Sequence, residues 1–239
     1  MLNRMKTASS EALDVRREIR TGIHEELRLL PESPFEWAGF EPGKALGAGA
    51  AADPRLVQLS RMICNAPARS AELRSMWNES VVTAAFAWRL APHLGSDANS
   101  CAIAGLLHRI GDLLTLRALG AVEYATRLRL DGPGKAELCV ELGEQQLERV
   151  VRAWRIPPRA ASTAAEWRRL RDFPEAAADA TTVYLSRLLA LELISPQFCA
   201  PGVLEHAVEE ARVNPAVLAR VRADRSVPML LVSLASFQP

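Results

Sequence analysis

The sequence predicts an all-α protein built from many helices. Apolar residues recur three and four positions apart along most of the chain, whereas no segment alternates apolar and polar residues over the length of a strand. With 239 residues, of which 49% are hydrophobic, the chain is long enough to bury a sizeable core without disulfides or metals. These observations favour a helical bundle.

The charge balance gives no general attraction to a polyanion. Lys plus Arg total 29 against 28 Asp plus Glu, which leaves a net charge of +1. Binding to nucleic acid or to an anionic membrane would therefore need a local basic patch. The run RRLRD at 168–172 is a candidate patch, although most runs of this kind are solvated helix faces. We expect neither a nucleic-acid partner nor a membrane partner.

The cysteines and the N-terminal residues favour a cytoplasmic protein. Cys64, Cys101, Cys139 and Cys199 lie far apart and form no CxxC or Cys/His cluster, so they predict reduced thiols rather than a zinc site or a redox pair. The first residues, MLNRMKTASSEALDVRREIR, lack the apolar core of a signal peptide. No stretch of about 18 apolar residues is present to span a bilayer.

The first expected helix spans residues 10–30. Leu13, Ile23 and Leu27 lie near one face of this helix, among charged residues, and Pro31 ends it. The pattern is that of an amphipathic helix. Whether it packs on the rest of the chain is left open by the sequence.

A connection rich in Pro and Gly follows. Residues 31–54 contain four Pro and four Gly, which predicts a loop or a short-helix connection. We therefore divide the chain into residues 1–45, a helix and connection whose mobility is left open, and residues 46–239, a helical domain.

The remaining chain shows a succession of helical segments. Prolines stand where several of them begin, as is typical of the first helical turn, and Pro174 precedes a long one with an apolar stripe. The expected helices span about 54–65, 71–93, 97–110, 112–130, 136–154, 158–171, 175–194, 202–212 and 215–223, and an apolar tail, VPMLLVSLASF, completes the chain.

The segment AGLLHRIGDLL at 104–114 places one polar pair, His108 and Arg109, in an apolar setting. Gly111 is expected to end the first helix in a left-handed conformation, and Asp112 to cap the next helix. Both polar side chains would then lie near a helix junction. Taken alone, this pattern also fits a buried core histidine beside an arginine that reaches solvent.

The run AGLLHRIGDLLTL resembles the AGLLHDIGKLLL signature of HDOD domains, signalling relatives of the HD-domain metal-dependent phosphohydrolases. MWNESVVTAAFAWRLA (76–91) resembles the family's LWxHS helix, AWRIPP (153–158) its W-x-L-P turn, and VYLSRLLA (183–190) its late helix. The four segments have the order and spacing of the family. The resemblance covers about residues 72–230 and implies an HD-like, HDOD orthogonal bundle.

The resemblance also locates the positions of the HD metal ligands. In catalytic HD domains the metal is held by a His on the first helix, by the His-Asp pair, and by an Asp on the late helix. The corresponding residues here are Glu79, His108, Arg109 and Arg187, and Trp167 and Arg168 stand at or near further histidine positions of the family. The resemblance therefore implies a degenerate HD site.

The two arginines exclude the metal chemistry of the HD family. A guanidinium offers no lone pair and stays protonated at ordinary pH, so Arg109 and Arg187 cannot ligate a metal. One imidazole and one carboxylate are too few ligands for a tetrahedral or octahedral site. We therefore expect no metal or other cofactor, and no phosphohydrolase activity, since no activated water can form.

We hypothesise that a salt-bridge plug replaces the metal. Glu79 would pair with Arg109 and Arg187 across the helix junction, and His108 would form a hydrogen bond into the same cluster. The alternative is an anion site, such as a nucleotide-phosphate site, in which Arg109, Arg168 and Arg187 act as donors.

A bacterial signal-transduction or regulatory domain is the function that the resemblance and the lost ligands favour. It would act through protein partners and would not be an enzyme. The alternatives are an HD-type metal-dependent phosphohydrolase and an anion-sensing or nucleic-acid-binding regulator. The helix at 10–30 and the apolar tail are the two segments expected to make contacts in trans if they do not pack on the chain itself.

Overall fold

A computed structural model of the chain describes residues 17–46, 53–167 and 178–235. Within these ranges the structure consists of helices and contains no strand, which confirms the predicted all-α class. After an N-terminal helix described over 17–26, the α-helices are α2 (Pro42–Ala45), α3 (Pro54–Cys64), α4 (Ser70–Leu90), α5 (Ala98–Leu107), α6 (Ile110–Thr126), α7 (Gly132–Ala153), α8 (Pro158–Glu166), α9 (Ala178–Ile194), α10 (Val203–Glu210), α11 (Pro215–Arg222) and α12 (Ser226–Ala235).

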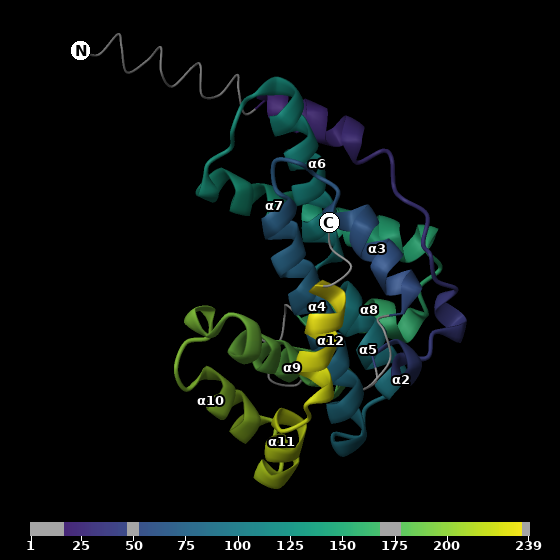
Figure 1. The fold of residues 1–239 in the computed structure, drawn as a ribbon, viewed down its shortest axis with the longest axis vertical. Helices are drawn as coiled ribbons and strands as arrows, with labels where there is room; N and C mark the ends of the chain where they lie inside the picture. The colour runs from purple at the N-terminus through teal and green to yellow at the C-terminus, as the bar shows by residue number, and fades with distance from the viewer. Residues whose placement is uncertain (1–16, 47–52, 168–177, 236–239) are drawn as a thin grey trace, which may run out of the picture.

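Helix α4 is the central element of the bundle. Figure 1 shows the N-terminal helix, α6 and α7 at one end of the molecule and α10 and α11 at the other, with α4 between them. Every residue of α4 from Glu79 to Ala87 is buried, as expected for a helix that is covered on all sides. Helices α5 and α9 both pack along it. The fold therefore carries Glu79 into the interior.

A glycine allows α5 to approach α4 closely. A Cβ atom built on Gly105 would lie 2.9 Å from the Cα atom of Ala84 in α4. No side chain fits in that space, so the two backbones are in direct contact. The contact fixes the position of the α5 C-terminus, from which His108 follows.

The predicted role of Gly111 as a left-handed helix end is wrong. Helix α5 ends at Leu107, and α6 begins at Ile110, so Gly111 lies inside α6 and has no positive φ. A Cβ built on Gly111 would lie 1.9 Å from the carbonyl oxygen of Gly143 in α7. Glycine is needed here because the backbones of α6 and α7 touch, which the chain-local pattern does not reveal.

The described part of the N-terminal segment packs on α6 and α7. Ile19, Ile23 and Leu27 are only 1%, 0% and 6% exposed. The indole Nε1 of Trp154, at the end of α7, donates a hydrogen bond of 2.7 Å to the carbonyl oxygen of Pro31. The apolar face of this helix is thus satisfied within the chain, whereas a domain boundary at residue 45 stays a prediction.

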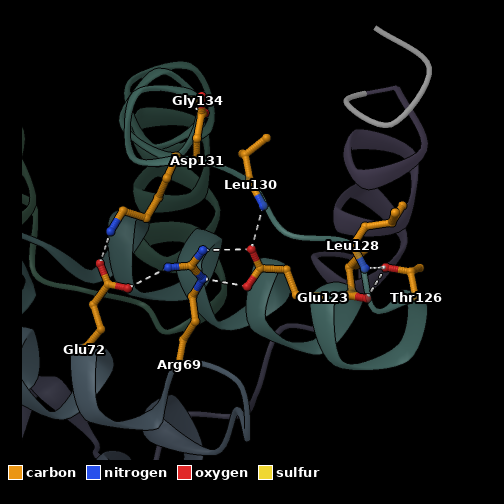
Figure 2. Close-up of polar contacts among 10 residues, drawn as sticks. Arg69, Glu72, Glu123, Thr126, Leu128, Leu130, Asp131 and Gly134 are labelled. Carbon is orange, nitrogen blue, oxygen red and sulfur yellow. Dashed lines mark hydrogen bonds and ion pairs between the residues drawn. The ribbon is translucent and has the colours of Figure 1, made fainter. Parts of the chain in front are cut away.

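A partly buried ionic network joins α6 and α7 to the start of α4, and Figure 2 shows it. We call it the anchor network. Arg69 binds Glu123 through two hydrogen bonds of 2.8 and 2.9 Å, and Glu72 through one of 2.8 Å. Glu123 also accepts a hydrogen bond of 3.0 Å from the backbone N–H of Leu130, and Lys135 contacts Glu72. The network therefore fixes the connection between α6 and α7.

Helix α6 ends at Thr126, before the predicted end at residue 130. Arg127 follows in the left-handed conformation, with φ of 64°, and its N–H still bonds to the carbonyl of Glu123. A left-handed residue at this position terminates a helix. The sequence contains no glycine at this point to signal the termination.

The described part of the apolar tail, residues 227–235, lies in α12, which packs on α4. Val227 and Leu230 are buried, whereas Met229 and Val232 are 58% and 72% exposed. In the part of the chain that the structure describes, no helix has both the length and the apolar character needed to cross a bilayer.

Candidate functional site

Three separate parts of the chain bring the predicted site residues together. Glu79 lies in the middle of α4, His108 and Arg109 form the junction between α5 and α6, and Arg187 lies on α9. These elements meet because α5 and α9 both pack along α4.

Glu79 forms hydrogen-bonded ion pairs with both arginines, as the plug hypothesis predicts. Arg109 Nη1 lies 3.0 Å from Glu79 Oε2, and Arg187 Nε lies 2.8 Å from Glu79 Oε1. The side chains are 10% exposed for Glu79 and 23% exposed for each arginine. Each carboxylate oxygen therefore holds one cation in a largely desolvated place, where charge-assisted hydrogen bonds are strong.

His108 lies beside this cluster, and we predicted a hydrogen bond from it into the cluster, but it forms none to Glu79. Its Nε2 atom is 4.0 Å from Glu79 Oε1, which is too long for a hydrogen bond. Its Nδ1 atom lies 2.7 Å from the carbonyl oxygen of Gly105. Because a carbonyl only accepts, Nδ1 carries a proton, and in the neutral ring the lone pair is on Nε2.

Trp167 closes one side of the site. Its ring contacts His108 edge-on, with centroids 4.8 Å apart, and its Nε1 donates a hydrogen bond of 3.1 Å to the backbone oxygen of His108. The guanidinium carbon of Arg187 lies 5.1 Å from the centroid of the Trp167 ring, within the range of a cation–π contact. Trp167 thus positions both a histidine and an arginine of the cluster.

The surroundings of Arg187 disfavour its charged form. Burial lowers its pKa, and repulsion from Arg109 acts in the same direction, although Glu79 partly compensates. An arginine still remains protonated at ordinary pH, because its pKa starts so high.

Asp112 joins the site, and our sequence interpretation missed this role. It lies in the first turn of α6 and does not cap that helix; the N-cap position is that of Arg109. Its Oδ2 atom is 3.5 Å from Arg109 Nε, so Arg109 bridges Asp112 and Glu79. The three-residue spacing of Arg109 and Asp112 is the signal that would have suggested the pair.

Gly143 makes room for Asp112. A Cβ built on Gly143 would lie 2.5 Å from Asp112 Oδ1. The missing side chain of Gly143 thus leaves space for the Asp112 carboxylate from the neighbouring helix. We refer to Glu79, His108, Arg109, Asp112, Trp167 and Arg187 as the Glu79 cluster.

The donor set of the Glu79 cluster does not fit the metal that the HD family would imply. Among the described residues, no group of three or more His, Cys, Asp or Glu side chains is placed to hold a metal ion. Arg109 and Arg187, which the resemblance aligns with two family ligands, both bind the carboxylate of Glu79. Arg168, the remaining predicted site residue, lies outside the described residues.

Comparison with known proteins gives one finding. The family model of the HDOD domain matches residues 56–167, which contain most of α3 and all of α4 to α8, and therefore Glu79, His108 and Arg109. Arg187 lies beyond the matched range, on α9. No curated protein and no solved structure gives a significant match to the chain. Residues 56–167, which run from within α3 to Trp167, are thus the part of the chain that is similar to the HDOD domain.

Proposed function

We propose that the protein is a non-catalytic regulatory domain of bacterial signal transduction that acts through contacts with other proteins. The observation that carries this proposal is the pairing of Glu79 with both Arg109 and Arg187. Arg109 and Arg187, which the resemblance aligns with metal ligands, cannot donate electron pairs, while residues 56–167 are similar to the HDOD domain. The domain then keeps a shape that partners can recognise without keeping the chemistry.

The charge balance of the Glu79 cluster supports this proposal over anion sensing. Among the described residues of the cluster, Glu79 and Asp112 offset the charges of Arg109 and Arg187. An incoming phosphate would have to compete with carboxylates that already accept the arginine hydrogen bonds. We therefore keep the anion site as an alternative outcome of the test below.

Metal binding by a restored ligand set tests the non-catalytic assignment. A triple variant, Glu79→His with Arg109→Asp and Arg187→Asp, rebuilds the family's ligand types around His108. We expect the triple variant to gain binding of Mn²⁺ in calorimetric titration, and the unchanged protein to show none. A stoichiometric transition metal in the unchanged protein, measured by elemental analysis and removed by His108→Ala, would establish a metal hydrolase instead.

Affinity capture from the source cell tests the contact role. Captured proteins are purified and recombined with the unchanged protein, and we expect a complex of defined stoichiometry. Arg187→Asp serves as the comparison, because it removes the ion pair with Glu79 and so disrupts the Glu79 cluster. Should a phosphate ester co-purify in place of a protein, and be lost in Arg187→Asp, the anion-sensing alternative would replace our proposal.

A further inference from the structure

A surface hollow lies away from the Glu79 cluster, where the end of α4 and the following turn η2 (Ala91–His93) meet α11. Its volume is about 630 Å³, and small-ligand sites typically have volumes of about 300–1,000 Å³. Its lining is formed by Trp88, Arg89, Pro92, His93, Arg220, Val221, Ala223 and Asp224. Trp88 is nine residues beyond Glu79 on the same helix, which places the hollow about 13 Å further along the axis.

The wall of the hollow contains a firmly held tryptophan. Trp88 is partly buried and packs against the hydrophobic core. A Cβ built on Gly43 in α2 would lie 3.1 Å from Trp88 Cζ2, so the indole rests directly on that backbone. The guanidinium of Arg89 lies 5.2 Å from the Trp88 ring centroid. With Pro92, Val221 and Ala223, this ring gives the hollow a mainly apolar surface.

The lining contains one ion pair, between Arg89 and Asp224. Arg89 contacts Asp224 and Ser226 and donates a hydrogen bond of 2.7 Å to the carbonyl oxygen of Ala85. Asp224 additionally accepts a hydrogen bond of 2.9 Å from the N–H of Ser226. These two charges therefore offset each other within the wall.

Arg220 has no such counterion. Its side chain is exposed on α11 and has no carboxylate partner among the described residues. An exposed imidazole, His93, also faces the hollow, and the only carboxylate in the lining is the paired Asp224. The hollow thus combines an apolar floor with one uncompensated cation.

We propose that this hollow is a binding site for a small apolar anion, namely an aromatic or branched aliphatic carboxylate. The apolar part would pack on Trp88 and Val221, and the carboxylate would pair with Arg220. Sites of this kind combine apolar walls with a few polar groups that fix orientation. The site shares no residue with the Glu79 cluster, so its failure or success is independent of the function proposed above.

Titration of the full chain with 2-naphthoate tests this site. The indole N–H signal of Trp88 in a ¹H–¹⁵N correlation spectrum is assigned by its absence in Trp88→Phe. We expect a saturable shift of this signal that fits one site per chain. No shift at millimolar 2-naphthoate would overturn the proposal.

Charge reversal and a neutral ligand test the role of Arg220. We expect Arg220→Glu to weaken binding of 2-naphthoate at least tenfold, because attraction becomes repulsion at short range. Arg61→Glu, which changes an exposed arginine on the distant helix α3, should leave the affinity within twofold. The neutral 2-naphthalenemethanol should bind at least tenfold more weakly than 2-naphthoate. Equal affinity in Arg220→Glu, or equal binding of the alcohol, would show that the hollow does not select anions.

Discussion

The anchor network and the Glu79 cluster contain the same kinds of charge but use them differently. Each combines two cationic side chains with two carboxylates in a partly buried place. The anchor network contains Arg69, Lys135, Glu72 and Glu123, and the Glu79 cluster contains Arg109, Arg187, Glu79 and Asp112.

The anchor network and the Glu79 cluster differ in their hydrogen bonding. In the anchor network, Arg69 binds Glu123 through two bonds, and the side chain of Glu123 is fully buried. Burial alone would lower the pKa of Arg69, but the hydrogen bonds to Glu123 and Glu72 outweigh burial and raise that pKa. Each arginine of the Glu79 cluster has a single hydrogen bond to Glu79, and the pKa of Arg187 is lowered.

This difference indicates that the anchor network stabilises the fold more than the Glu79 cluster does. The anchor network raises the pKa of Arg69 and lowers the pKa of Glu72, so it stabilises the ionised states of these two side chains. The Glu79 cluster holds two cations on one carboxylate at the cost of repulsion between them. Local conflict of this kind is typical of sites retained for function rather than for stability.

Glu123→Gln should have the largest effect on stability. It leaves the Arg69 guanidinium without its main counterion in a buried place, and we expect a loss of about 3 to 5 kcal/mol in the free energy of unfolding. Urea denaturation followed by circular dichroism measures this loss. Glu148→Gln, which breaks the exposed pair with Arg152, is the control and should change little. A small effect of Glu123→Gln would mean that the anchor network does not stabilise the fold.

Gly111→Ala should have the second-largest effect on stability, because the added methyl group pushes apart α6 and α7, which support both clusters. The added methyl group would overlap the Gly143 carbonyl, and we expect a loss of about 3 kcal/mol, the upper end for overpacking. Gly132→Ala is the matched control, since nothing lies within 4 Å of its built Cβ and its φ is not positive. Equal unfolding midpoints for the two variants would contradict the backbone contact between α6 and α7.

Glu79→Gln should lower the free energy of unfolding by less than these two substitutions, by about 2 kcal/mol. The arginines it leaves behind are each 23% exposed, so water can solvate them partly, and Arg109 retains Asp112. Combining Glu79→Gln with Arg187→Leu should recover part of the loss, because the unpaired cation is removed together with its counterion. If Glu79→Gln were as costly as Glu123→Gln, the two clusters would be equivalent and the comparison would fail.

The smallest effect concerns acid stability. Burial alone would raise the pKa of Glu72, but Lys135 and Arg69 hold it below its ordinary value. A depressed folded-state pKa stabilises the protein above the unfolded-state pKa, near 4.5, and this contribution is lost as the pH falls through the folded-state value. Between pH 5 and 3, the unchanged protein should therefore lose more stability than Glu72→Gln. Parallel slopes of the unfolding free energy against pH in the two proteins would argue against this ion pair.

The sequence by itself determined the fold class, the approximate helices and the chemistry that is missing. Prolines at helix starts, as in α3 and α8, act through the backbone of their own residue. Likewise, Arg109 and Arg187 lack lone pairs whatever surrounds them, so their inability to ligate a metal follows from residue type alone. Such properties are local, and a local pattern reveals them.

Only the tertiary structure decided how the helices approach one another and which charges meet. Gly111 serves the contact with Gly143, 32 residues later, and not the helix end that its own neighbourhood suggested. Arg69 and Glu123 are 54 residues apart, and no pattern within either helix signals their pairing. The distance between two backbones depends on the packing of side chains throughout the core. Residues whose role depends on that distance therefore become intelligible only once the helices are in place.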